Sequence, residues 1–252
     1  MTGEITLQEW FATPLGQLRA QAEVEALTRV LAAYRPGFLV QVGSFGGGAT
    51  LCVNGAVRHW VVEPGGAADA AVVASPDDLP FRSGSVDTLV LVHCLEFGTD
   101  PHALLREAVR SLAPEGHLLI LAFNPMSLWG IGRMVAPLAG LGRPWAGHYY
   151  TALRLRDWCR LLGLEHREQR RLFFRPPIPH PGLQQRLAGL ERVGSALWPM
   201  LGGVNLCVSR KRVPRAIPMG ALLRRQKPVQ AARPVAGRSC RCAANDSDME
   251  RQ

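Results

Sequence analysis

One stretch near the N-terminus, residues 38–48 (FLVQVGSFGGG), constrains the fold more than any other part of the chain. Residues 38–42 form a mostly apolar run whose length fits a buried strand. Gly43 and three further glycines at 46–48 then crowd the turn that follows. Glycine lets the backbone adopt positive φ and lets a ligand approach main-chain N–H groups. A strand, this turn and a helix over about 49–54 would form a nucleotide-sized site, although a plain glycine-rich turn has the same signature.

Further apolar runs and helical periodicities predict a layered α/β fold. The segment 16–34 has helical spacing of its apolar residues, and Asp100 followed by Pro101 predicts the start of a second helix. Seven runs are typical of strands, at 38–42, 58–62, 71–74, 86–92, 117–123, 164–174 and 203–209. Strands that alternate with helices favour a Rossmann-like, doubly wound, seven-stranded and mostly parallel sheet.

The chain of 252 residues has the length of one such domain with appendages. We expect a domain over 1–213, with a core at 38–123, an irregular lid-like insertion at about 124–150 and C-terminal elements at 151–213. The insertion and the proline run at 176–181 would cover the crevice at the sheet edge, or contact a membrane surface.

The last segment, 214–252, is rich in Pro, Ala, Gly and Arg and lacks aromatic residues, which predicts a disordered tail. It carries eight Arg or Lys against three Asp or Glu, so +5 of the net charge of +9 lies there. Such a tail could contact nucleic acid or anionic lipid, or be a solvated extension.

No apolar run reaches the length of a membrane span, and the first ten residues lack a secretory pattern, so we expect a cytoplasmic protein. The six cysteines are mostly isolated, and Cys240 and Cys242 have no second Cys or His pair nearby. We therefore expect neither a disulfide framework nor a metal site.

Glu63 stands 20 residues after Gly43, at the carboxyl end of the second predicted strand. There it could accept hydrogen bonds from the two hydroxyls of a ribose held on the glycine turn, or simply be a surface residue beginning a turn. Ser75, Pro76 and the following aspartates come after the third strand and would reach the same edge of the sheet. An adenine base would lie there.

At this point the sequence resembles the class I S-adenosylmethionine-dependent methyltransferases of the type 11 group. The resemblance lies in residues 79–81 (LPF), 85–87 (SVD), 93–96 (HCLE), 100–101 (DP), 105–107 (LRE) and 112–117 (LAPEGH). With the glycine turn and Glu63 it covers roughly residues 38–123. More narrowly, residues 124–130 (NPMSLWG), 154–158 (RLRDW) and 198–199 (WP) are similar to a bacterial subgroup with an Asn-Pro-x-Ser-Leu-Trp-Gly segment.

The resemblance implies S-adenosylmethionine as the cofactor. Gly43 and Ser44 would contact its methionine part, and Glu63 would hold the ribose. Ser75 and Pro76 fall where the family contacts adenine, although the family usually has Asp or Asn at the position of Ser75.

Two departures from the family pattern fall in the glycine turn. Gln41 occupies a position that is usually acidic and that contacts the methionine ammonium, so it would hold that group without a charge. Phe45 replaces the second glycine. Both leave open a non-catalytic relative, for which Gln41→Asp and Phe45→Gly together should improve cofactor binding.

Four side chains are candidates near the transferred methyl group: His93, which the resemblance also places against the cofactor, and Asn124, His148 and Tyr149 on the substrate side. His93 follows the fourth strand, where the sulfonium would meet the substrate, and could be a general base or a structural histidine. Asn124 could bind a planar substrate or form an Asn-Pro turn, while His148 and Tyr149 could line the site or pack within an aromatic loop.

The sequence thus predicts methyl transfer from S-adenosylmethionine to a small-molecule acceptor. A non-catalytic cofactor-binding module is one alternative. A nucleic-acid-associated methyltransferase that uses the basic C-terminal regions is another, and it would show steep salt dependence.

Overall fold

The computed structural model describes residues 10–45, 51, 58–63, 72–135, 147–176, 187–189, 194 and 197–212. All of them belong to the first of two units, Met1–Val213 and Pro214–Gln252. Residues 136–146 of the predicted lid, most of the predicted helix at 49–54, most of the proline run and the whole tail therefore fall outside the described residues.

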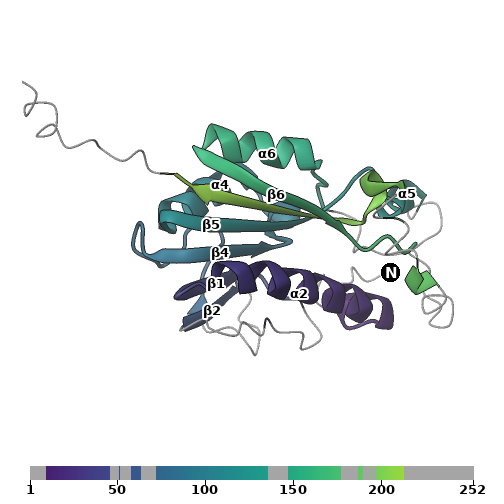
Figure 1. Ribbon diagram of the computed structural model, residues 1–252, viewed down its shortest axis with the longest axis horizontal. Helices are drawn as coiled ribbons and strands as arrows, with labels where there is room; N and C mark the ends of the chain where they lie inside the picture. The colour runs from purple at the N-terminus through teal and green to yellow at the C-terminus, as the bar shows by residue number, and fades with distance from the viewer. Residues whose placement is uncertain are drawn as a thin grey trace, which may run out of the picture. The chain divides into compact units, whose positions relative to one another are not determined.

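The described part is built on a seven-stranded sheet with the order β3-β2-β1-β4-β5-β7-β6 (Figure 1). Strands β1 to β5 pair in parallel, β7 runs antiparallel to β5, and β6 runs antiparallel to β7. The strands are β1 (Phe38–Val42), β2 (Arg58–Glu63), β3 (Val72–Val73), β4 (Val86–Val92), β5 (Leu112–Phe123), β6 (Leu164–Leu172) and β7 (Val204–Lys211). The predicted Rossmann-like, mostly parallel seven-stranded sheet is confirmed.

Helices flank the sheet. They are α2 (Pro14–Tyr34), α3 (Cys94–Phe97), α4 (Pro101–Ser111), α5 (Leu128–Val135) and α6 (Ala152–Leu161), with 3-10 turns η1 (Leu187–Gly189) and η2 (Pro199–Leu201). No helix among the described residues is long and apolar enough to cross a membrane.

Alternate side chains of each central strand pack into two separate hydrophobic cores, because successive residues of a strand point to opposite faces of the sheet. Leu39 of β1 packs with the α2 side chains Leu27 and Leu31 on one face. Its neighbour Val40 belongs to the other core, with Leu105 of α4 and Leu155 of α6. The sheet is therefore covered by α2 on one face and by α4 and α6 on the other (Figure 1).

The helix boundaries follow from capping residues. The Thr13 side chain accepts a hydrogen bond from Gly16 N at 3.2 Å, and Pro14 opens α2. The Asp100 carboxylate accepts from His102 N at 2.8 Å and Ala103 N at 3.0 Å, so α4 begins as its sequence predicts.

The insertion after β5 differs from the prediction, because its first part is the helix α5 and not irregular chain. Ser127 Oγ caps this helix by accepting from Gly130 N at 3.1 Å. A Cβ atom at Gly130 would lie 1.9 Å from Pro125 O. The glycine therefore allows the turn at Pro125 to pack against the first turn of α5, and it does not interrupt the helix. This close approach has no signature in the hydrophobic periodicity.

Candidate functional site

The glycine turn begins where β1 ends, beside the ends of β2 and β4. Gly43 has φ of +84°, a conformation that favours glycine, and its N–H donates to Val62 O at 2.9 Å. A Cβ atom there would lie 2.6 Å from Val92 O and 3.0 Å from Cys94 Sγ. The chain thus needs glycine at this position in order to bring three strand ends together.

Gln41 presents a buried acceptor at this turn. The side chain is 3% exposed, and its Nε2 donates to Gly43 O at 2.8 Å. Its Oε1 is also buried and has no hydrogen-bond partner within the described structure. A buried carbonyl without a donor carries a cost of about 1–3 kcal/mol that a ligand N–H could remove. The geometry therefore fits the ammonium group of a methionine, held without a formal charge.

Ser44 and Glu63 come together at the ends of β1 and β2. The Ser44 hydroxyl donates to the Glu63 carboxylate, and Glu63 is 4% exposed. Ser75 lies on the neighbouring strand end, two residues beyond Val73, which pairs with Glu63 in the sheet. The exposed Ser75 hydroxyl donates to the Asp77 carboxylate, and the half-buried Pro76 lies between them. The predicted cofactor residues thus follow adjacent strands along one edge of the sheet.

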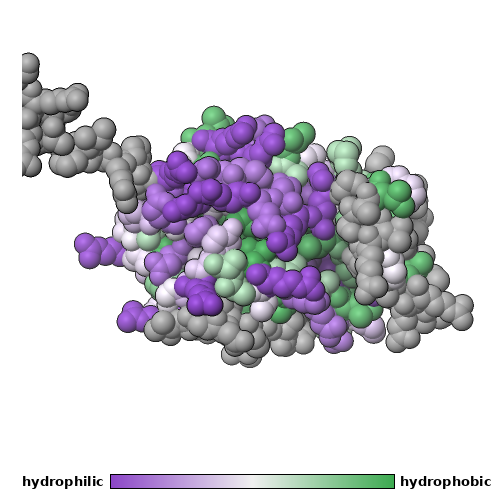
Figure 2. Space-filling view, in the orientation of Figure 1, coloured by the Kyte–Doolittle hydropathy of each residue, from purple (hydrophilic) through white to green (hydrophobic). Residues whose placement is uncertain are grey.

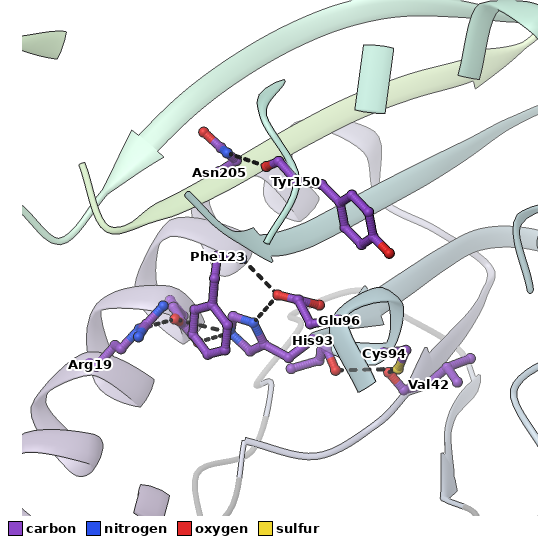
Figure 3. Close-up of polar contacts among 10 residues, drawn as sticks. Arg19, Val42, His93, Cys94, Glu96, Phe123, Tyr150 and Asn205 are labelled. Carbon is purple, nitrogen blue, oxygen red and sulfur yellow. Dashed lines mark hydrogen bonds and ion pairs between the residues drawn. The ribbon is translucent and has the colours of Figure 1, made fainter. Parts of the chain in front are cut away.

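His93, directly after β4, is the centre of a buried charged network (Figure 3). Its ring Nδ1 lies 3.0 Å from Glu96 Oε1, and its Nε2 lies 3.2 Å from each carboxylate oxygen of Glu23. Arg19 Nε donates to Glu23 Oε1 at 2.9 Å. Phe123 N donates to Glu96 Oε1 at 2.7 Å, which anchors the network to the end of β5. All four charged side chains are 1% exposed or less.

Aromatic rings surround the cationic members of this network. The Arg19 guanidinium lies 4.1 Å from the ring centroid of Phe123 and 4.9 Å from that of Trp129. The His93 ring stacks on Phe123 at 4.2 Å. The rings exclude water, which strengthens the ion pairs and makes every unpaired charge costly.

The carboxylates keep His93 protonated. Burial alone would lower its pKa, but Glu23 and then Glu96 raise it to about 9. Burial would likewise raise the pKa of Glu23, but His93 and Arg19 hold it below its ordinary value. As an imidazolium with both N–H groups donating to carboxylates, His93 has no free lone pair. The geometry contradicts its predicted role as a general base and favours the structural alternative.

The matches with known proteins agree with this geometry. A family model described as a methyltransferase domain matches residues 55–120. The chain is 33% identical over 203 residues to the uncharacterized protein YafS of Escherichia coli (strain K12), and the alignment covers 81% of this chain and 80% of YafS. The chain belongs to the YafS family.

Solved structures share the fold at low sequence identity. One is titled a SAM-dependent methyltransferase, possible histamine N-methyltransferase, from Thermotoga maritima, with a TM-score of 0.57, 18% identity and coverage of 81% of this chain and 93% of that chain. Another is the [4+2]-cyclase SpnF, with a TM-score of 0.51, 16% identity and coverage of 84% and 98%. The YafS-family chain therefore has the domain and the fold of S-adenosylmethionine-dependent methyltransferases.

Phe45 does not lie against the ligand side of the turn. Its side chain is fully buried in the core beneath α2, with Leu51 and Val92. Phe45→Gly would remove that packing, which typically costs about 3–5 kcal/mol for a large-to-small change of this kind. The phenylalanine anchors the turn to the core, so we expect this substitution to destabilise the fold and not to open the turn to the cofactor.

Asn124 has a structural role and not the predicted contact with substrate. Its Nδ2 donates to Met200 O and to Gly202 O, both at 2.8 Å, and its Oδ1 accepts from Met126 N at 3.2 Å. These bonds occupy the side-chain amide and fasten the end of β5 to the segment that leads into β7.

The two remaining acceptor-side candidates lie near the network. His148 is exposed, and its main-chain N–H donates to Glu96 O at 2.8 Å. Tyr149 packs on Phe123, with ring centroids 5.2 Å apart. The structure thus brings residues 148 and 149 close to the ends of β4 and β5.

Three members of the network were missed in the sequence. Arg19 and Glu23 stand four residues apart on the stripe of α2 that also carries Leu27 and Val30, so two charges interrupt an apolar face. That interruption is a usable signal, because charges on a buried face need partners. The third, Glu96, lies in a segment recognised only by family resemblance.

Proposed function

We propose that this protein transfers a methyl group from S-adenosylmethionine to a small-molecule acceptor in the cytoplasm. The observation that carries the proposal is the buried Gln41 Oε1 beside Gly43, which has no hydrogen-bond partner among the described residues and lies at the strand end where the fold's cofactor crevice is found. The methyltransferase domain match supports the same cofactor.

Each of the predicted cofactor residues would contact a different part of S-adenosylmethionine. Gln41 would accept a hydrogen bond from the methionine ammonium, while main-chain groups of Gly43 and Ser44 would contact the rest of that moiety. Glu63, whose position is fixed by Ser44, would accept from the ribose hydroxyls. Ser75 and Pro76 would border the adenine. When bound, S-adenosylmethionine supplies a methyl group on a positively charged sulfur.

An aromatic cluster supports an organic acceptor of modest size. Phe123 contacts Phe97 and Tyr149, with ring centroids 6.4 and 5.2 Å away, at the ends of β4 and β5. Apolar and aromatic surfaces with few polar groups are typical of small-molecule sites. We also propose that the chain belongs to the subgroup with the Asn-Pro-x-Ser-Leu-Trp-Gly segment, in which Asn124, Ser127 and Gly130 each have a specific structural role here.

Thermal unfolding with and without S-adenosylmethionine tests the proposal. A ligand that binds only the folded state stabilises it by about 2.7 kcal/mol at a concentration of one hundred times Kd. We expect the wild type to gain thermal stability with the cofactor and Glu63→Ala to gain little. Glu25→Ala removes an exposed carboxylate from α2 and should respond like the wild type. Equal responses of Glu63→Ala and the wild type would contradict the assignment of Glu63.

A non-catalytic cofactor-binding module is the main alternative. It is supported by Gln41 and by the [4+2]-cyclase among the structures of this fold, since the fold alone does not determine the reaction. Cofactor binding without label transfer from S-[methyl-³H]adenosylmethionine to any acceptor would favour this alternative.

Nucleic-acid association is a second candidate, supported by basic side chains on α6 and β6. Residues 154–175 contain seven arginines against three acidic residues, and Figure 2 shows hydrophilic side chains gathered in this region. A cavity of about 360 Å³ between α2 and β6 is lined by Arg29, Arg170 and Arg171. RNA retention that falls steeply with salt and with Arg170→Ala/Arg171→Ala would support it; salt-independent retention would not.

A further inference from the structure

Glu96 has one carboxylate oxygen that the buried network does not use. Its Oε1 accepts hydrogen bonds from Phe123 N and His93 Nδ1. Its Oε2 is fully buried and has no hydrogen-bond partner anywhere in the described structure. In contrast, both oxygens of Glu23 are engaged by His93 and Arg19. Among the described residues, the only carboxylate oxygen of these two side chains without a hydrogen-bond partner is therefore Glu96 Oε2.

The short helix that carries Glu96 begins beside the end of β1. Cys94, two residues before Glu96, donates its thiol hydrogen to Val42 O at 3.1 Å, which joins the start of α3 to the end of β1. Figure 3 shows the second oxygen of Glu96 turned away from His93, on the side where Tyr150 lies. Burial and then the Glu96 charge raise the pKa of the Tyr150 phenol, consistent with that proximity.

The network restrains the Glu96 side chain through its Oε1 oxygen. Arg19 fixes Glu23, Glu23 fixes His93, and His93 together with Phe123 N fixes Oε1 of Glu96. Since the rotamer of a side chain tied at one oxygen is restricted, Oε2 has a defined direction before any ligand binds. A positioned and desolvated carboxylate oxygen at the carboxyl end of β4 is suited to contact a reacting group.

We propose that Glu96 is a catalytic residue whose Oε2 accepts a hydrogen bond, and then the proton, from the nucleophilic N–H or O–H of the methyl acceptor. This inference rests on the proposed function. The acceptor lone pair forms the bond to the methyl carbon, the methyl–sulfur bond breaks, and its electron pair stays on sulfur. The proton leaves the acceptor for Glu96 Oε2 and later passes to solvent.

The inference specifies the class of acceptor. A carboxylate oxygen can only accept a hydrogen bond, so it recognises a nucleophile that carries a proton, such as an amine or a hydroxyl. A thioether or a tertiary amine offers no proton and would leave Oε2 buried and unpaired, at a cost of about 1–3 kcal/mol. A thiol carries a proton but is only a weak donor, so the methyl group should be found on nitrogen or oxygen.

The test uses S-[methyl-³H]adenosylmethionine with the small-molecule fraction of a bacterial lysate, and full-length wild-type, Glu96→Gln and Glu107→Gln proteins. Glu107 is a matched control, because it too accepts a hydrogen bond from a main-chain amide, Leu79 N at 3.0 Å. Unlike Glu96, it lies on α4 and outside the buried network. Thermal midpoints and the Kd for S-adenosylhomocysteine are measured for each protein, so that folding and cofactor binding are known independently of turnover.

We expect Glu96→Gln to lower label transfer about 10²- to 10⁴-fold, the usual contribution of general acid–base catalysis, with the cofactor Kd within about threefold of wild type. Glu107→Gln should transfer label within about twofold of wild type. If Glu96→Gln does not fold, the inference is tested by the position of the methyl group in the wild-type product, which NMR determines.

Three results would overturn the inference. They are label transfer by Glu96→Gln close to that of the wild type, a tenfold or larger loss of cofactor affinity in that variant, and a wild type that binds the cofactor but methylates sulfur, carbon or no acceptor. In the second case Glu96 would serve the cofactor ammonium. A wild type that binds no cofactor would instead contradict the proposed function itself.

Discussion

At the scale of single residues, the Arg19–Glu23–His93–Glu96 network buries four charges, and this is costly in free energy unless every charge keeps its partner. Its four charges are removed from water and balance one another, and its imidazolium sits at a left-handed backbone position with φ of 50°. Buried ion pairs often contribute little net stability, yet removing one partner typically costs about 3–5 kcal/mol because the others are left unpaired. The network therefore acts as a single unit.

The protonation of His93 predicts how stability depends on pH. Its folded-state pKa of about 9 lies above the ordinary value of 6.5, so its contribution is complete below pH 6.5 and is lost as pH rises through about 9. The loss should approach about 3 kcal/mol. Urea unfolding of the wild type from pH 6 to 10 measures it.

His93→Asn is the control for this pH dependence, because asparagine tolerates the left-handed conformation but has no imidazolium. It should be less stable than the wild type near pH 6 and nearly independent of pH over the same interval. Parallel pH curves for the two proteins would show that His93 is neutral in the fold.

Gln41→Asp tests the buried acceptor at the glycine turn. A carboxylate should bind the methionine ammonium more tightly than an amide carbonyl, by roughly tenfold, because charge-assisted hydrogen bonds are stronger. The unliganded protein should lose stability, because the Nε2 bond to Gly43 O is lost and a charge is buried. The affinity is measured by titration with S-adenosylmethionine and with 5′-methylthioadenosine, which lacks the amino acid. Gln41→Asp should leave the Kd for 5′-methylthioadenosine unchanged. An equal gain in affinity for both ligands would refute the assignment of Gln41.

At the scale of elements, the joint between β5 and β7 depends on Asn124. We expect Asn124→Ala to lower the free energy of unfolding by about 2–3 kcal/mol, because the buried carbonyl of Gly202 and the part-buried carbonyl of Met200 lose their donor. Asn205→Ala removes one 3.2 Å bond to Tyr150 O from a side chain whose Oδ1 has no partner in the described part of the chain, so this substitution should cost less stability. Urea titrations that rank the two variants in the opposite order would contradict this account.

The sequence predicted the elements better than their connections. Helix α4 and strand β4 could be placed because Asp100–Pro101 and an unbroken apolar run are local signals. The helix α5 could not, because a glycine packed against Pro125 O looks the same in sequence as a helix-breaking glycine. Only the folded structure distinguishes them.

At the scale of the whole described domain, the sheet brings distant sequence segments to one edge. Gly43 and Glu63 could be assigned from the sequence because parallel strands place their carboxyl ends together. The role of His93 could not, because its partner Glu23 is 70 residues away and on a helix that the fold alone brings under β4. The same is true of the buried position of Phe45.

Isothermal titration of the wild-type protein with S-adenosylmethionine and S-adenosylhomocysteine tests the central claim most directly. Since the groups that would hold the methionine and the ribose are already positioned, we expect saturable one-site binding of both ligands. Glu63→Ala should weaken the binding of both. Folded protein that gives no heat with either ligand at about millimolar concentration would contradict the account, since such an affinity falls below about 4 kcal/mol of binding free energy.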